Sequence, residues 1–209
     1  MRTLYYATSN AGKLHSLKRR IERYDVEVVQ ANLDIPEPRS SDVEEIAKAK
    51  ADLAFGKILK ECIVVDAGFY IPSLGGFPRA FVNFALETIG LPGILRLVDG
   101  KARACEFREC LAYMGEAIAH DEASTMPDPR LFTSHIRGTL AAEPRGVRQP
   151  YHWSELSTIF IPEGETKTLG EMDEGEYYAW ASDTTRKESC HVSFTEWYVR
   201  VNDLKAAPV

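Results

Sequence analysis

The stretch Arg2-Thr3-Leu4-Tyr5-Tyr6-Ala7-Thr8-Ser9-Asn10-Ala11-Gly12-Lys13 opens the chain and decides its fold. Residues 3–7 are β-branched, aromatic or apolar in succession, which predicts a strand covered on both faces. Apolar side chains then recur along one helical stripe at Leu14, Leu17, Ile21 and Tyr24. We therefore expect a strand, a short polar turn and a helix that begins near Asn10.

The turn between this strand and this helix has the properties of an anion site. Backbone N–H groups without a helical partner and the positive end of the helix dipole gather there. Lys13 adds a full positive charge, and the combination suits a phosphate group. The alternative, which the turn alone leaves equally open, is that Asn10 only caps the helix and Lys13 is solvated.

The composition gives the chain enough apolar surface for a good core. It has 209 residues, of which 44% are apolar, and a net charge of -6. These values predict one domain over residues 1–209, with room for a smaller lobe. The negative charge argues against a broad nucleic-acid surface. No apolar run approaches the roughly 20 residues of a membrane span, and no signal segment is visible, so we expect a cytoplasmic protein that does not enter a membrane.

The cysteines are spread along the sequence, at Cys62, Cys105, Cys110 and Cys190. They show neither the paired spacing of a zinc motif nor the density of a disulfide scaffold. We therefore expect them to be packing residues.

A second helix is expected to begin after Ser40-Ser41-Asp42, and its first turn is acidic. Glu44 follows Ser41 by three residues, as in a capping box. In the simpler interpretation the acidic side chains are only caps. In the functional alternative one or two of them hold a metal ion, and we select Asp42 and Glu45 for this role.

An apolar run, Cys62-Ile63-Val64-Val65, ends at Asp66-Ala67-Gly68. This pattern predicts a buried strand with a carboxylate at its tip. Ligands of open α/β sheets collect beyond the carboxyl ends of the strands, so we expect Asp66 to lie near the turn at residues 8–13. An Asp before a Gly is otherwise usually a turn former, but the coincidence of two strand ends favours a site.

The rest of the chain mixes strands with irregular segments. Strands are expected over residues 103–113, 131–133, 136–140 and 159–162, and an edge segment over residues 168–172. Residues 173–187 are polar and have no assignable pattern, and a terminal helix is expected over residues 193–201. Tyr151, His152 and Trp153 follow one another in a polar loop, where exposed rings can stack on a base. On this stretch alone we favour the alternative that they fold onto the sheet as core.

In their order along the chain, these landmarks resemble the inosine triphosphate pyrophosphatase family, which hydrolyses non-canonical purine nucleoside triphosphates. The resemblance covers most of residues 3–172. Its motifs are Thr8, Asn10 and Lys13 of a Thr-x-Asn-x-x-Lys turn, the acidic helix start before Lys50-Ala51, Asp66-Ala67-Gly68, and residues 74–78, 89–95, 159–164 and 171–172.

This resemblance implies an α/β fold with a long, twisted, mixed central sheet, helices on both sides and two lobes around a nucleotide cleft. It also implies a homodimer and Mg²⁺-dependent hydrolysis of a nucleotide substrate to nucleoside monophosphate and pyrophosphate. The expected catalytic residues are Asp66 and Lys13. The expected substrate-binding residues are Thr8, Ser9, Asn10, Lys13, Phe81, His152 and Trp153. The expected metal ligands are Asp42, Glu45 and Asp66.

The sequence departs from the family pattern in several places, three of which bear on catalysis and base recognition. Val65 stands where the first of two acids is expected, the loop around residues 151–155 is enlarged, and Ser182-Asp183-Thr184 replaces Ser-His-Arg. We therefore expect base recognition by stacking more than by hydrogen bonds, with weak discrimination among purines. Two other functions stay open: a nucleotide-binding module without turnover, and a nucleotide-processing hydrolase that cleaves a different bond.

Overall fold

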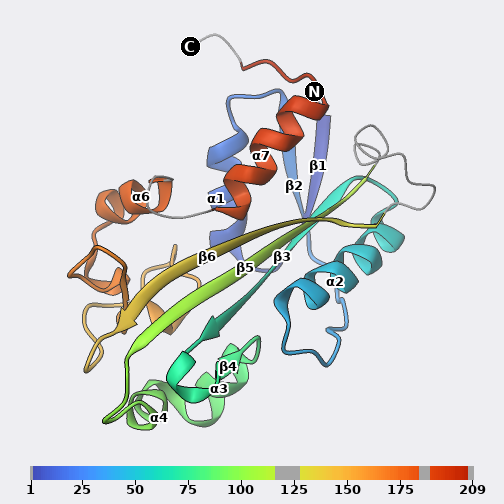
Figure 1. The fold of residues 1–209 in the computed structure, drawn as a ribbon. Coiled ribbons are helices and arrows are strands. Elements are labelled where there is room, and N and C mark those ends of the chain that lie inside the picture. The colour runs from blue at the N-terminus through green and yellow to red at the C-terminus, as the bar shows by residue number, and fades with distance from the viewer. Residues whose placement is uncertain (1, 116–127, 184–188, 207–209) are drawn as a thin grey trace. The chain divides into compact units, whose positions relative to one another are not determined.

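The computed structural model describes residues 2–115, 128–183 and 189–206 (Figure 1). The chain divides into two compact units. Unit 1 draws on residues 1–66, 109–133 and 189–209, and unit 2 on residues 67–108 and 134–188. Thr184, the last residue of the segment that replaces Ser-His-Arg, lies outside the described residues.

The described residues form the mixed α/β fold that the resemblance implies. The strands are β1 (Arg2–Ala7), β2 (Val26–Ala31), β3 (Cys62–Tyr70), β4 (Pro78–Arg79), β5 (Ala104–Met114), β6 (Arg130–Leu140) and β7 (Phe160–Pro162). The helices are α1 (Ala11–Ile21), α2 (Val43–Ile58), α3 (Val82–Thr88), α4 (Gly90–Leu97), α6 (Glu174–Ser182) and α7 (Cys190–Val201). The strands hydrogen-bond in the order β2-β1-β3-β5-β6-β7, and β4 pairs with β3. None of these helices is both long and apolar enough to cross a bilayer.

Unit 1 opens with the predicted strand, turn and helix. Leu4 and Tyr6 of β1 have no exposed surface. The strand is parallel to both of its neighbours, β2 and the first part of β3, where Tyr5 lies opposite Cys62. An inner parallel strand has both faces covered, which explains the unbroken apolar run in the sequence.

The two faces of the sheet in unit 1 carry different helices. Helix α7 packs against α1, and α2 lies on the other side of the strands (Figure 1). Neighbouring residues of β5 show this division. Glu109 contacts Cys190 of α7, whereas the acidic start of α2 acts on Cys110. Successive side chains of a strand point to opposite faces, so one strand supplies a residue to each helix layer.

Strand β3 does not end at Asp66, as the sequence predicted, but continues to Tyr70. Gly68 permits the continuation, because a Cβ atom there would lie 2.8 Å from the backbone oxygen of Arg79 on the paired strand β4. Asp66 nevertheless lies level with the turn after β1. The reason is that β1 stops at Ala7 while the parallel strand β3 runs on.

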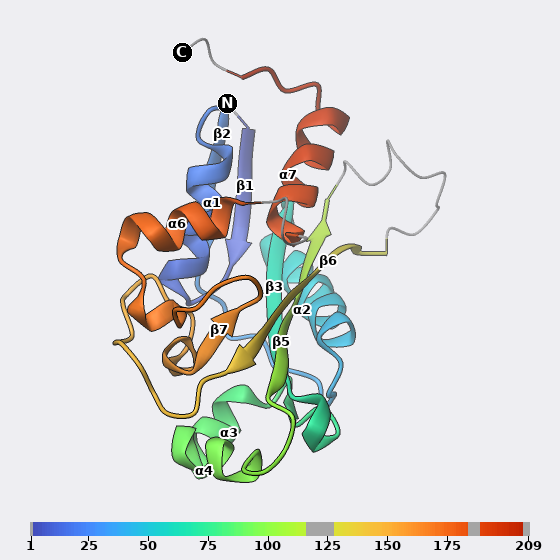
Figure 2. The ribbon, with the colours of Figure 1, turned by 60° about the vertical axis from the view of Figure 1, so that its left-hand side comes forward.

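Unit 2 is built around aromatic side chains. The ring centroids of Phe69 and Phe107 lie 4.7 Å apart, and those of Phe107 and Phe160 lie 4.9 Å apart. Strand β7 lies beside β6 (Figure 2). The two strands are antiparallel, with Phe160 opposite Leu140. Each such ring pair stabilises the folded state by about 0.5–1.5 kcal/mol beyond the effect of burying its area. This cluster therefore stabilises the position of the loops that surround it.

Two segments of unit 2 differ from the predictions. Residues 168–172 do not form an edge strand, because Thr168 and Glu171 make a reciprocal capping box that winds them into a single 3₁₀ turn. Residues 174–182, which had no assignable pattern, form α6. A second capping box, between Asp173 and Glu176, starts this helix.

Candidate functional site

The turn after β1 is shaped by its own side chains. The Asn10 side chain accepts a hydrogen bond from the backbone N–H of Lys13 at 3.1 Å, so the predicted helix cap is confirmed. The Thr8 hydroxyl accepts from the backbone N–H of Asn10 at 3.1 Å. Gln30 of the neighbouring strand β2 donates to the backbone oxygen of Thr8 at 2.9 Å. These three bonds fix the turn at the N-terminus of α1, next to the exposed Ser9.

Lys13 reaches from α1 to the middle of β3. Its Nζ donates to the backbone oxygen of Val65 at 3.1 Å, which places the ammonium group beside Asp66. Burial lowers the pKa of Lys13, and the carboxylates of Asp66 and Glu109 oppose this effect. The alternative of a solvated Lys13 is therefore wrong, because the side chain is held against the sheet.

A second lysine pairs with Asp66. Lys50 of α2 lies 3.0 Å from Asp66 Oδ2 and 2.8 Å from Glu37 Oε1. Burial alone would lower the pKa of Lys50, but the two carboxylates outweigh it and raise the pKa. Sequence reasoning used Lys50 only as a family landmark. Its position on the buried stripe of α2, seven residues after Val43, was the available signal, because a charged residue there needs a buried partner.

The acidic first turn of α2 contains residues with different partners. Asp42 caps the helix, since its Oδ1 accepts from the backbone N–H of Glu44 at 2.8 Å. The predicted capping box of Ser41 and Glu44 is therefore wrong, because the side chain of Asp42, which is closer in sequence to Glu44, caps the helix in place of Ser41. Glu45 accepts a hydrogen bond from the Ser40 hydroxyl at 2.7 Å.

Three carboxylates of unit 1 act on one thiol. The pKa of Cys110 is raised to about 12, chiefly by burial and then by the charges of Glu44, Asp66 and Asp42. Within the described residues these carboxylates do not form a closed cage of ligand atoms. Mg²⁺ usually binds through one or two carboxylates and completes its shell with water and substrate phosphates, so an open set of this kind fits that ion.

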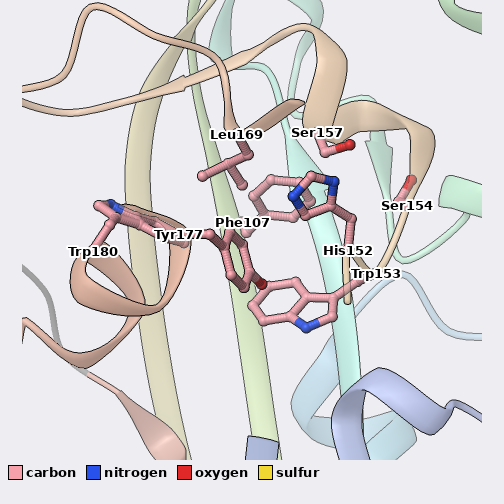
Figure 3. A pocket seen from close by; sticks show the side chains of 8 residues that line it. All are labelled: Phe107, His152, Trp153, Ser154, Ser157, Leu169, Tyr177 and Trp180. Atoms are coloured by element: carbon pink, nitrogen blue, oxygen red, sulfur yellow. The ribbon is translucent and has the colours of Figure 1, made fainter. Parts of the chain in front are cut away.

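The loop that contains His152 and Trp153 lines a pocket in unit 2 (Figure 3). The pocket measures about 320 Å³ including its opening to solvent. Its lining residues are Phe107, His152, Trp153, Ser154, Ser157, Leu169, Tyr177 and Trp180. Trp153 packs edge-on against Phe107, with ring centroids 6.1 Å apart, and Tyr151 also packs on the core. The interpretation of this stretch as core is confirmed.

His152 is a buried, neutral imidazole in the pocket wall. Its side chain is 3% exposed, and its Nδ1 accepts from the backbone N–H of Gln149 at 3.0 Å, so the hydrogen is assigned to Nε2. Burial and the nearby Arg148 lower the pKa of His152 to about 4. The Nε2 atom has no hydrogen-bond partner in the described part of the chain.

Two serines of the same wall differ in their bonding. The Ser154 hydroxyl oxygen accepts from the backbone N–H of Leu156 at 3.2 Å. The Ser157 hydroxyl is buried and has no hydrogen-bond partner among the residues that the structure describes. Sequence reasoning missed Ser157, although its place between the apolar Leu156 and Ile159 indicated a buried hydroxyl. The pocket therefore combines aromatic walls with one N–H group and one hydroxyl group that lack partners.

Phe81 does not line this pocket. It stands just before α3 and is 48% exposed. The neighbouring helices expose further apolar side chains, namely Phe84, Ile89 and Leu97.

The family model described as the Ham1 family matches residues 4–181. This chain belongs to the Ham1 family. A dITP/XTP pyrophosphatase of Methanopyrus kandleri is 36% identical over 194 residues, which cover 92% of this chain and 94% of that protein. A dITP/XTP pyrophosphatase of Thermococcus kodakarensis is 31% identical over 170 residues, with coverages of 81% and 84%.

Solved Ham1 structures share the fold. A HAM1 protein from Coxiella burnetii superposes with a TM-score of 0.75 at 20% identity, covering 96% of this chain and 100% of that chain. The resemblance and the fold class expected from the sequence are thus confirmed. The Ham1 match ends before Cys190 and His191 at the start of α7.

Proposed function

We propose that this protein hydrolyses a non-canonical purine nucleoside triphosphate to the nucleoside monophosphate and pyrophosphate, with Mg²⁺. One observation carries the proposal: Lys13, at the N-terminus of α1, bonds to Val65 directly beside the carboxylate of Asp66. A cation for phosphate and an anion for a metal ion are thus adjacent. The names of the relatives from Methanopyrus kandleri and Thermococcus kodakarensis support this reaction and this class of substrate.

The triphosphate is assigned to the turn of residues 8–13. Backbone N–H groups at a helix N-terminus bind anions, and the first turn of α1 contains no acidic residue that would repel them. Thr8 and Asn10 hold the turn in shape, Ser9 is exposed for contact, and Lys13 supplies the positive charge.

Mg²⁺, when bound, neutralises the triphosphate and lowers the pKa of the attacking water. We assign its protein ligands to Asp66 and the first turn of α2. Asp42 and Glu45 were the choice from the sequence. The shared effect of Asp42, Glu44 and Asp66 on Cys110 supports Glu44 in place of Glu45, whose carboxylate already accepts from Ser40. Lys50 orients Asp66 through its 3.0 Å contact with Oδ2.

Recognition of the base is assigned to His152, Ser157 and Trp153. The Nε2–H of His152 matches a carbonyl acceptor such as the 6-oxo group of hypoxanthine or xanthine, and repels the amino group that adenine carries there. We therefore propose selection by a hydrogen bond in place of the weak discrimination by stacking that the sequence led us to expect. The enclosed part of the pocket has room for about one water molecule. A base therefore enters only if the aromatic wall opens. Phe81 stays a proposal from the resemblance alone.

The remaining expectations concern assembly and location. We propose a cytoplasmic homodimer that does not bind nucleic acid, supported by the resemblance and by the net charge of -6. The exposed Phe84 and Ile89 are the first side chains to test at the interface. Sedimentation of the full chain measures the assembly, and a monomer in wild type would contradict it.

Product analysis tests the function. The full chain is incubated with inosine, deoxyinosine, xanthosine, adenosine and guanosine triphosphates, with Mg²⁺ or with a chelator. Equal amounts of pyrophosphate and monophosphate are expected, and only with Mg²⁺. Release of orthophosphate would instead assign a different bond, and tight binding without any product would assign a nucleotide-binding module.

A further inference from the structure

Three side chains that commonly bind metals meet inside unit 1. They are Glu109 of β5 and the first two residues of α7, Cys190 and His191, and they are 4%, 0% and 5% exposed. Their candidate ligand atoms all lie within 4.8 Å of one another. Over the described ranges this is the one group of three such residues with this closeness.

Two of the three spacings are close to those of a tetrahedral zinc site. Bonds of about 2.3 Å to sulfur and about 2.0–2.1 Å to nitrogen and oxygen, at tetrahedral angles, separate neighbouring ligand atoms by roughly 3.6 Å. Cys190 Sγ lies 3.4 Å from His191 Nδ1 and 3.8 Å from Glu109 Oε2, just below and just above this value. A thiolate, an imidazole and a carboxylate are zinc donors, whereas Mg²⁺ prefers oxygen alone.

The charges of the cluster balance when a divalent cation is present. A thiolate and a carboxylate together bring two negative charges into a buried region, and such burial is costly unless the charges are compensated. Tyr6 of β1, which has no exposed surface, offers a fourth candidate ligand atom, its hydroxyl oxygen. Its hydroxyl lacks a hydrogen-bond partner in the described chain. Burial raises the pKa of Tyr6, and the charges of Cys190 and Glu109 raise it further.

We propose that Glu109, Cys190 and His191 form a buried structural site for Zn²⁺, with Tyr6 or water as the fourth ligand. The site fastens the beginning of α7 to β5. Its ligands differ from the carboxylates assigned to Mg²⁺, which act on Cys110 on the opposite face of the same strand. Asp66 and Glu109 nevertheless both act on Lys13, so the two groups lie on either side of this lysine's charge. Cys190 and His191 also lie beyond residues 4–181, the part that the Ham1 family model matches.

Metal titration of the full chain tests the proposal without nucleotide or turnover. Protein stripped by a chelator is titrated with Co²⁺ alone, followed by Zn²⁺. One Co²⁺ per chain is expected, with the visible bands of tetrahedral cobalt and a near-ultraviolet thiolate-to-cobalt band, both erased by Zn²⁺. Zn²⁺ should also raise the melting temperature of the stripped chain, because it binds only the folded state. Binding below one equivalent, or cobalt without a thiolate band, would overturn the site.

Variants assign the ligands. Cys190→Ser keeps the shape but should remove the thiolate band, and Glu109→Gln and His191→Gln should each weaken Co²⁺ binding about tenfold or more. Cys62→Ala and Cys105→Ala remove buried thiols elsewhere and should leave the cobalt spectrum unchanged.

The same 3.8 Å contact would also suit a weak hydrogen bond from the Cys190 thiol to Glu109. In that case wild type would take up no cobalt with a thiolate band, and the proposal would fail whatever the variants do. Circular dichroism of each variant confirms that it has folded, so that loss of metal is not mistaken for loss of structure.

Discussion

The turn of residues 8–13 in unit 1, which we propose binds the phosphates, and the aromatic pocket of unit 2 differ in how their polar groups are bonded. In unit 1, Lys13, Lys50 and Asp66 are already joined to neighbours by bonds of 3.0–3.1 Å. In unit 2, His152 and Ser157 hold an N–H and a hydroxyl without partners among the described residues, in an apolar wall. Fixed charges attract any triphosphate, whereas buried polar groups favour only a ligand that satisfies them. We therefore propose that the first region supplies affinity for the triphosphate and the second supplies selectivity for the base.

The largest effect on activity is expected from Asp66→Asn. An amide keeps the shape but removes the anionic metal ligand, so we expect Mg²⁺-dependent kcat/KM to fall at least about 100-fold, or about 2.7 kcal/mol. Pyrophosphate release measures it. Glu37→Gln is the matched control, because it removes the other partner of Lys50 and leaves Asp66 in place. A folded Asp66→Asn chain with normal turnover would show that the metal is held elsewhere.

The second effect concerns the pH dependence of stability. The pKa of His152 is about 4 in the folded chain, against 6.5 for a histidine in water. As the pH falls, the unfolded chain therefore takes up the proton before the folded chain does. The contribution of the neutral ring to the free energy of unfolding is fully present above pH 6.5 and is lost as the pH falls to 4. The full loss is about 3 kcal/mol.

Urea unfolding between about pH 7.5 and pH 4 measures this dependence. His152→Phe should flatten the slope in that range, while His15→Gln, at an exposed position, should not change it. An equal slope in wild type and His152→Phe would mean that another group is responsible.

The third effect distinguishes two lysines of α1: Lys13, which is hydrogen-bonded to β3, and Lys18, which is exposed. Lys13→Ala should weaken binding of a non-hydrolysable triphosphate by about 1.5–3 kcal/mol, since it removes a charge-assisted contact. Lys18→Ala, at an exposed position of α1, should change little. Calorimetry gives both affinities. Equal losses of affinity in the two variants would show that Lys13 contributes only through the overall positive charge of the helix and makes no specific contact with phosphate.

The smallest effect tests selectivity in the pocket. His152→Phe should reduce the preference for deoxyinosine over deoxyadenosine triphosphate about tenfold, or about 1.4 kcal/mol. Ser154→Ala should leave the preference unchanged, because the Ser154 hydroxyl already caps Leu156. Trp153→Ala should weaken all nucleotides by similar factors. These measurements use kcat/KM for each nucleotide, and an unchanged preference in His152→Phe would move base recognition to other residues.

The structure of the turn at residues 8–13 could be predicted because its interactions are local. Asn10 caps a backbone group only three residues away, and the parallel pairing of β1 with β3 follows from the apolar runs. Lys50 and Asp66 are 16 residues apart, and no pattern in the sequence directly indicated the hydrogen bond between them. The only indication was a lysine on the buried stripe of a helix. Ser157 was missed because a single hydroxyl changes no pattern.

Other features of the structure, such as helix α6 and the contact between Glu109 and Cys190, could not be predicted from the spacing of apolar residues. Helix α6 has no one-sided apolar stripe, so only its capping box predicts its start. Glu109 and Cys190 are 81 residues apart, and no periodicity joins them. Cys190 was expected to be a packing residue like the other cysteines, and its burial agrees with that, but its neighbours are set by tertiary structure alone.

The alternation of Glu109 and Cys110 along β5 places a constraint on chain length. Glu109 belongs to the α7 side and Cys110 to the α2 side, so each depends on whether an odd or an even number of residues precedes it in the strand. Deleting one residue between Ala104 and Arg108 would exchange the two side chains and disturb both layers at once. Deleting two would restore them to their own sides. We therefore expect length changes in this strand to be tolerated only in pairs.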